Sequence, residues 1–175
     1  MANVRTHIAS GNVVFSSVQC GANVKAALEA ELCDYAGKPV GVFVRTGAEM
    51  AQIVADSPIV NHPSNRTKVV FLDAPPAPHA RAQARHMADE QLAIGTREIH
   101  VGYGGGMRDS KLKIPAAKDG NACDMHIVAK LAAMANDQLR RAGRARATRG
   151  RETDSVKSAV SLLLETSILS AGRGY

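Results

Sequence analysis

Hydrophobic and polar residues alternate at the start of the chain, and this alternation predicts a β-hairpin. Val4, Thr6 and Ile8 are separated by polar residues, which is the spacing of a strand with one buried face. A second apolar run at residues 13–15 predicts the partner strand. Gly and Asn tolerate the positive φ of tight hairpin turns. The turn is therefore assigned to Ser10, Gly11 and Asn12.

A helical period follows the hairpin. In residues 21–36 the apolar side chains recur every three or four positions, which predicts an amphipathic helix. Its expected inward stripe is Val24, Leu28, Leu32 and Tyr35. Residues 40–45 are apolar on both faces, which predicts a central strand. Thr46 and Glu49 have the spacing of a capping box, so we expect a short helix to begin there.

Strands and helices alternate again in the second half of the chain. The pattern predicts strands at 68–72, 91–94 and 98–103, and helices at 79–89, from 109 or 110 to 117, and from Asp124 onward. The whole alternation predicts an α+β protein made of two small sandwiches in series. We assign the sandwiches to residues 1–60 and 66–137, joined by the turn formers NHPSN.

The composition changes in the last part of the chain. Residues 138–175 contain 8 basic and 3 acidic residues, whereas residues 1–137 contain 14 basic and 13 acidic residues. The net charge of +6 therefore belongs mainly to this tail and not to a face of the body. The Arg-rich run at its start is typical of disorder. The apolar spacing within residues 155–170 predicts a short amphipathic helix after it.

Composition narrows the class of protein. With 45% hydrophobic residues in 175, the chain is able to bury a core. Its three cysteines form no CxxC pair, which argues against a disulfide scaffold and for a reducing cytoplasm. No apolar run approaches the roughly 18 residues of a membrane helix. We therefore expect a cytoplasmic protein that is not embedded in a membrane.

Four motifs occur in order along the chain. They are NVRTHIASGNVVFSS, VFVRT followed by AEM, REIHVGYGGGM followed by DSKLKIPAA, and VAKLAAMA. This ordered set resembles the bacterial family catalogued as domain of unknown function 1697, and the resemblance runs to about residue 135. It implies two tandem ferredoxin-like α/β plaits. It implies no reaction, because the biochemical function of the family is not established.

The resemblance also predicts a departure from the family pattern. Members begin with a strand and a helix ahead of the hairpin, whereas here Met1 lies almost at the hairpin. We therefore expect a truncated, diverged member whose first plait lacks its first strand and helix. That strand is central in a plait, so its loss would leave unpaired backbone groups. Such an open sheet edge favours self-association.

Two loops and one basic run are the candidate binding elements. The hairpin residues Ser10, Gly11 and Asn12 offer a hydroxyl and an amide, although turns select them for backbone reasons. Residues 104–111 combine glycine N–H groups with a lysine, as anion sites do, but lack the P-loop pattern. The candidate anion-binding residues are Gly105, Gly106, Ser110 and Lys111. The basic run offers phosphate contacts through Arg140, Arg141, Arg144 and Arg146.

The sequence presents no catalytic or metal-binding set. The six histidines are scattered, and Cys123, Asp124 and His126 are interpreted as the beginning of a helix. The sequence predicts a noncatalytic binding or interaction module of unknown ligand, with no cofactor; enzymatic activity stays open. One alternative is an enzyme or binder acting on a nucleotide or phosphorylated metabolite at residues 104–111. The other is nonspecific nucleic-acid binding through the tail.

Overall fold

The structure, a computed structural model, describes residues 2–7, 11–59, 62–148 and 158–164. This part of the chain has a mixed α+β fold with two four-stranded sheets and three α-helices. The chain divides into two compact units. The first unit is Met1–Ala51 together with Lys130–Tyr175, and the second is Gln52–Ala129.

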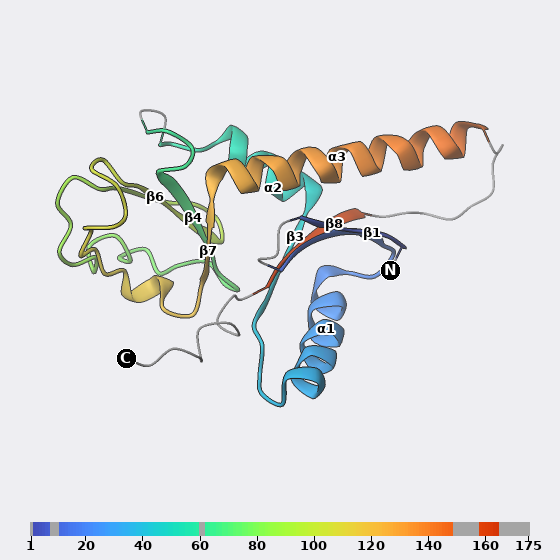
Figure 1. Cartoon of the computed structure of the whole chain (residues 1–175), viewed down its shortest axis with the longest axis horizontal. Helices are drawn as coiled ribbons and strands as arrows, with labels where there is room; N and C mark the ends of the chain where they lie inside the picture. Colours follow the sequence, from blue (N-terminus) through green and yellow to red (C-terminus); the bar gives the residue numbers. More distant parts are fainter. Residues whose placement is uncertain (1, 8–10, 60–61, 149–157, 165–175) are drawn as a thin grey trace. The chain divides into compact units, whose positions relative to one another are not determined.

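The first sheet has the strand order β1-β2-β8-β3, and every pair in it is antiparallel. Three of its strands come from the beginning of the chain: β1 (Ala2–His7), β2 (Asn12–Ser17) and β3 (Val42–Thr46). The fourth, β8 (Ser158–Leu164), comes from the tail. Within this unit the sheet lies between α1 (Gly21–Ala36) and α3 (Met125–Thr148), as Figure 1 shows.

The tail strand β8 occupies an inner position of this sheet. It pairs with β2 from Asn12↔Leu163 to Ser17↔Ser158, and with β3 from Val42↔Leu164 to Thr46↔Val160. The expected gap in the first sheet is therefore filled by a strand of the same chain. Because β8 is inside, β3 lies at the sheet edge, and the prediction that it is central was wrong.

The tail differs from its predicted secondary structure in two places. Helix α3 continues to Thr148 through the Arg-rich run, for which the composition predicted disorder. The run forms a helix because Leu, Arg and Ala are strong helix formers. The helix predicted within 155–170 was wrong over Ser158–Leu164, which is a strand. A strand with neighbours on both sides needs no polar face, so a run such as AVSLLL fits it as well as it fits a helix.

Helix α1 packs against one face of the first sheet, as its period predicts. Val24 is fully buried and contacts a cluster with Phe15, Val42 and Val44, and Leu28 and Leu32 pack against that cluster. Tyr35 is 91% exposed, so its place in the inward stripe was wrong. The helix ends at Gly37, whose φ of 67° is the left-handed conformation typical of a glycine C-cap.

The predicted capping box forms at the beginning of α2 (Gly47–Ala55). The hydroxyl of Thr46 accepts a hydrogen bond from the Glu49 N–H at 3.2 Å, and the Glu49 carboxylate accepts one from the Thr46 N–H at 2.7 Å. Each side chain satisfies a backbone donor that the first helical turn leaves without a partner. Met50 and Ile53 of this helix are buried.

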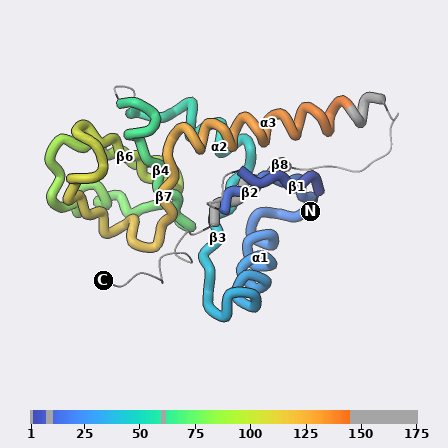
Figure 2. Tube along the Cα trace, in the orientation of Figure 1, coloured from blue at the N-terminus to red at the C-terminus, as the bar shows by residue number. Residues whose placement is uncertain are grey.

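The second sheet has the strand order β5-β6-β4-β7, again antiparallel throughout. Figure 2 labels β4, β6 and β7 of this sheet along the trace. The strand of this sheet that comes first in the sequence, β4, therefore lies between the third, β6, and the fourth, β7. The four strands are β4 (Thr67–Phe71), β5 (Gln91–Ile94), β6 (Glu98–Gly102) and β7 (Asn121–Asp124). Val70, Ile99 and Val101 form the centre of its hydrophobic cluster.

The connections between these strands contain less helix than the sequence predicts. Residues 79–89 form turns, bends and an isolated bridge at Arg85, and not a helix, since this polar segment has no apolar stripe to bury. Of the helix predicted up to residue 117, only the 3₁₀ turn Pro115–Ala117 forms. Cys123 and Asp124 are the last two residues of β7, a strand that the sequence did not predict. The helix predicted from Asp124 onward begins at the next residue, Met125, and includes His126.

Candidate functional site

The edge strand β1 carries a β-bulge. Ala2 pairs with Ser16 and Arg5 pairs with Val14, so three steps along β1 face two steps along β2. Asn3 lies inside this irregularity with a φ of +54°, a left-handed conformation that few residues other than Gly, Asn and Asp adopt. Bulges redirect the strand and its side chains, and they are frequent near binding sites. Here the bulge directs the carbonyl of Asn3 toward α3.

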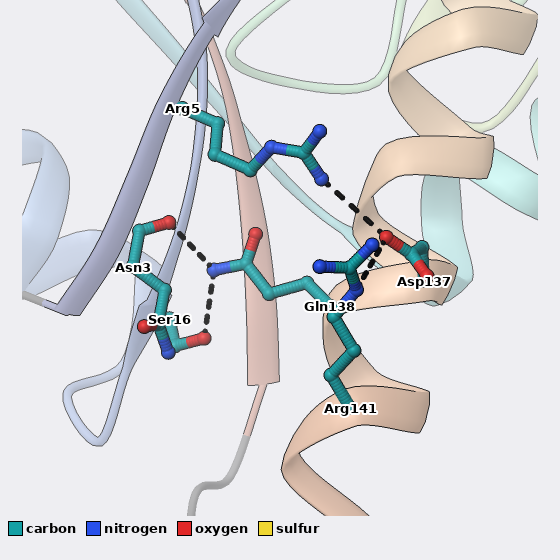
Figure 3. A network of polar contacts seen from close by, with 6 residues as sticks. All are labelled: Asn3, Arg5, Ser16, Asp137, Gln138 and Arg141. Carbon is teal, nitrogen blue, oxygen red and sulfur yellow. Dashed lines mark hydrogen bonds and ion pairs between the residues drawn. The ribbon is translucent and has the colours of Figure 1, made fainter.

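Gln138 of α3 holds this bulge. Its side chain is only 5% exposed, and its Nε2 donates hydrogen bonds to the Asn3 carbonyl and to the Ser16 Oγ, both at 2.9 Å. The other end of the amide differs. Oε1 is buried and accepts no hydrogen bond from any residue that the structure describes. In Figure 3 this oxygen points away from Asn3 and toward the side where Arg5 lies.

Two guanidinium groups converge on a single carboxylate beside this amide. The Asp137 Oδ2 forms an ion pair with the Arg141 Nε at 2.9 Å and accepts a hydrogen bond from the Arg5 Nη1 at 3.4 Å. All three side chains are partly exposed, Arg141 by 75%. Figure 3 shows Arg5 reaching this carboxylate from β1, while Asp137 and Arg141 lie one turn apart on α3. The group therefore carries one excess positive charge.

Arg5, Gln138 and Arg141 line a cleft of about 390 Å³ in the first unit. Pockets that bind small ligands are typically about 300–1,000 Å³. The wall combines an apolar part, an amide and two guanidinium groups. The lining residues are Asn3, Val4, Arg5, Gln138, Arg141 and Ala142.

The bulge gives a direct test of how the cleft is built. We expect Asn3→Val to destabilise the first unit by about 1–3 kcal/mol, because a β-branched residue tolerates positive φ poorly. Asn3→Gly, which adopts this φ without strain, is expected to change stability by less than about 1 kcal/mol. Urea unfolding of both variants measures the difference. Equal stabilities would show that residue 3 does not require the left-handed conformation.

The second unit contains a separate hollow of about 440 Å³. Its wall is rich in proline, and its charged lining residues, Asp73 and Asp119, are both acidic. None of the predicted anion-binding residues lines it. This hollow therefore gives an anionic ligand no guanidinium or ammonium group.

The glycine-rich loop is tied to two carboxylates. The Gly105 N–H donates to Asp89 Oδ2 at 2.6 Å, and the Ser110 hydroxyl donates to Glu90 Oε1. Hydrogen bonds from Ser110 and from the Ala88 N–H lower the pKa of Glu90, which keeps it ionised. Gly106 has a φ of +108°, and Lys111 is exposed. Two of the four predicted anion-binding residues thus already donate to internal anions.

The other predicted site residues lie in three places. Gly11 has the positive φ, 79°, that a tight hairpin turn requires, and Asn12 is a buried residue of β2, while Ser10 lies outside the described residues. Arg140, Arg141 and Arg144 are exposed on α3. The backbone of Arg146 continues this helix, but its side chain lies outside the described part. Of all these residues, only Arg141 lines the cleft.

Cys123 and His100 are buried titratable groups of the second sheet. Burial raises the pKa of the Cys123 thiol to about 11, so it stays protonated at neutral pH and is not a thiolate nucleophile. Burial also lowers the pKa of His100, which is 3% exposed, although Glu98 acts in the opposite direction. The Nδ1 of His100 is buried and has no hydrogen-bond partner among the described residues.

His100 predicts an acid-sensitive fold. Its folded pKa lies below the ordinary value of 6.5, so the unfolded chain takes up the proton first as the pH falls. The free energy of unfolding therefore decreases below about pH 6.5. We expect His100→Leu to flatten this decrease between pH 7 and 5. The exposed His79, replaced by Gln, is the matched control at a histidine outside the core. An unaltered slope in His100→Leu would refute the assignment.

The comparisons with known proteins identify a family. The family model described as "Protein of unknown function (DUF1697)" matches residues 1–100, more than half of the chain. The chain belongs to this family. No curated protein and no solved structure matches it. The DUF1697 match includes Asn3 and Arg5 but ends before Gln138 and Arg141, so it covers only one wall of the cleft.

The described residues include no helix that combines the length and the apolar character needed to cross a bilayer. Their His, Cys, Asp and Glu side chains form no group of three arranged to hold a metal ion.

Proposed function

We propose that this DUF1697 member is a noncatalytic binding module whose site is the cleft between the β1 bulge and α3. The observation that carries the proposal is the Oε1 of Gln138, which lies in the wall of the cleft and is a buried acceptor without a partner among the described residues. A buried polar group that makes no hydrogen bond costs about 1–3 kcal/mol. Such a cost is tolerated where a ligand supplies the partner.

The arrangement around Gln138 supports a preformed site. The amide is held by two hydrogen bonds, one to the backbone of β1 and one to a side chain of β2. If the amide were reversed, its oxygen would face the Asn3 carbonyl, and two acceptors would repel each other. Its acceptor end is therefore fixed in direction before a ligand arrives. A fixed polar group loses little entropy on binding.

A pair of variants tests whether the cleft binds ligands. Ala142 lines the cleft, whereas a Cβ on the neighbouring Gly143 would meet nothing within 4 Å. We expect Ala142→Phe to fill the cleft and abolish binding of any compound selected from a pool of small metabolites by ligand-observed NMR. Gly143→Phe should bind as the unaltered protein does. Equal binding by the two variants, or no binding by the unaltered protein, would refute the proposal.

Two alternatives remain as separate proposals. The loop at residues 104–111 would take an anion through Lys111, but Asp89 and Glu90 already occupy two of its donors and would repel a second negative charge. Nucleic-acid binding would use Arg140 and its exposed neighbours on α3. A steep loss of heparin retention with salt would favour the second alternative.

We also propose that each unit is a ferredoxin-like plait, and that the protein is cytoplasmic. The order of the second sheet supports the first point, since its strands 2-3-1-4 follow the plait arrangement. In the first unit β8 would take the inner strand position, antiparallel to both neighbours. The three free cysteines support a reducing compartment.

A further inference from the structure

The charges and hydrogen-bonding groups of the cleft indicate which ligand it takes. We propose that it binds a small carboxylate that also carries a hydroxyl group. This inference rests on the proposed function, because it names the ligand class of the same cleft. Three features of the wall carry it: the excess of guanidinium over carboxylate, the direction of the Gln138 amide, and the size of the cleft.

The guanidinium groups favour a planar monoanion. Arg5 and Arg141 face a single carboxylate, Asp137, so one positive charge is left over. Each guanidinium makes one contact with Asp137, both through Oδ2, although a guanidinium has five N–H donors. A carboxylate matches the remaining fork of donors in a bidentate manner. Asp137 thus shows, within the protein, the kind of anion that this pair accepts.

Gln138 adds a requirement that a simple carboxylate does not meet. Its Oε1 is only an acceptor, and an ionised carboxylate has no donor to offer it. The ligand therefore needs an additional O–H or N–H. An ammonium group would be repelled by the two guanidinium groups beside it. A neutral hydroxyl group donates to the amide oxygen without that repulsion.

The size and the remaining wall limit the ligand to a short chain. The cleft of about 390 Å³ is at the small end of ligand sites. Val4, which is 59% exposed, and Ala142 supply the apolar surface for a few methylene groups. Because Oε1 is covered in this structure, part of the wall has to move when the hydroxyl reaches it. We assign this movement to Arg5, which is partly exposed and lies on the side toward which Oε1 points (Figure 3). A carboxylate that enters the cleft gives the guanidinium of Arg5 a new ion-pair partner after this movement.

A set of small probes separates the need for a carboxylate from the need for a hydroxyl group. Butyrate, its 2-, 3- and 4-hydroxy derivatives, 1,3-butanediol and inorganic phosphate are titrated into the full-length ¹⁵N-labelled protein. The Arg141 Nε–H and the Gln138 side-chain NH₂ signals report binding. We expect at least one hydroxybutyrate to bind about fivefold more tightly than butyrate, which corresponds to one net hydrogen bond. The diol and phosphate are expected to bind more weakly than that hydroxybutyrate.

Two variants test whether Arg141 binds the carboxylate and whether Gln138 provides the preference for the hydroxyl group. Arg141→Gln, at an exposed position, is expected to lose binding of butyrate and hydroxybutyrate alike. Gln138→Met should keep butyrate binding and lose the preference for the hydroxyl group. If Gln138→Met does not fold, Ser16→Ala tests the same point. It removes one of the two acceptors that orient the amide, so it should reduce the preference for the hydroxyl group. Equal affinities for butyrate and all hydroxybutyrates, or equal binding of the diol, would overturn the inference. Metabolite binding that Ala142→Phe abolishes, without any response to carboxylates, would overturn the ligand class and leave the proposed function standing.

Discussion

Replacing Leu162 by proline is expected to destabilise the first unit by about 3 kcal/mol or more. Leu162 lies in the middle of β8, where its neighbours across the two ladders are Val13 and Val44. Proline removes a backbone donor, and an inner strand has hydrogen-bonding partners on both sides, so the loss falls on a ladder bond. Without β8, β2 and β3 are not neighbours in the sheet order.

Amide hydrogen exchange with unfolding by urea measures this effect. In Leu162→Pro we expect the amides of β2 and β3 to lose protection, while those of β4 and β6 in the second unit keep it. Leu162→Val is the matched control, because it keeps the N–H and favours a strand. Full protection of β2 and β3 in Leu162→Pro would show that the tail strand contributes nothing to the sheet.

Replacing Phe71 by alanine is expected to destabilise the second unit by about 3–5 kcal/mol. Phe71 is fully buried in β4, the strand that lies between β6 and β7. Its truncation removes a large apolar surface from the core and leaves a cavity that the surrounding side chains fill only in part. Phe71→Leu keeps most of the volume and should cost less.

The same hydrogen-exchange experiment measures the effect of Phe71→Ala, and Tyr35→Ala is its control. The amides of β4 and β6 are expected to lose protection, in contrast to the pattern of Leu162→Pro. Tyr35→Ala, at a side chain that is 91% exposed, should change stability by less than about 0.5 kcal/mol. A loss below about 1 kcal/mol in Phe71→Ala would place this side chain outside the core.

Local signals in the sequence predicted the elements whose hydrogen bonds are local. The helix at Gly21–Ala36 follows from its apolar period, and the capping box at Thr46 from residues three positions apart. The sequence failed where the pairing is long-range. Val160 of β8 pairs with Phe15 and with Thr46, and nothing in a run of apolar residues distinguishes an inner strand from a buried helix.

The cleft could be predicted only in part for the same reason. Gln138 and Asn3 are 135 positions apart, and their hydrogen bond depends on the fold of the whole unit. One signal does exist in the sequence. Leu131 and Ala135 are buried, and Gln138 follows them at the next position of the same helical stripe. A glutamine on the buried stripe of a helix is expected to need hydrogen-bonding partners for its amide. This signal in the sequence could have indicated the site.

The tail strand β8 completes the first sheet and so supports the strand that carries the cleft. A ¹⁵N-edited NOESY spectrum of the uniformly ¹³C,¹⁵N-labelled chain tests this pairing. We expect cross-strand contacts from the backbone of Val160 both to Phe15 and to Thr46. Sequential amide contacts typical of a helix through residues 158–164, or contacts from Phe15 directly to Thr46, would contradict it.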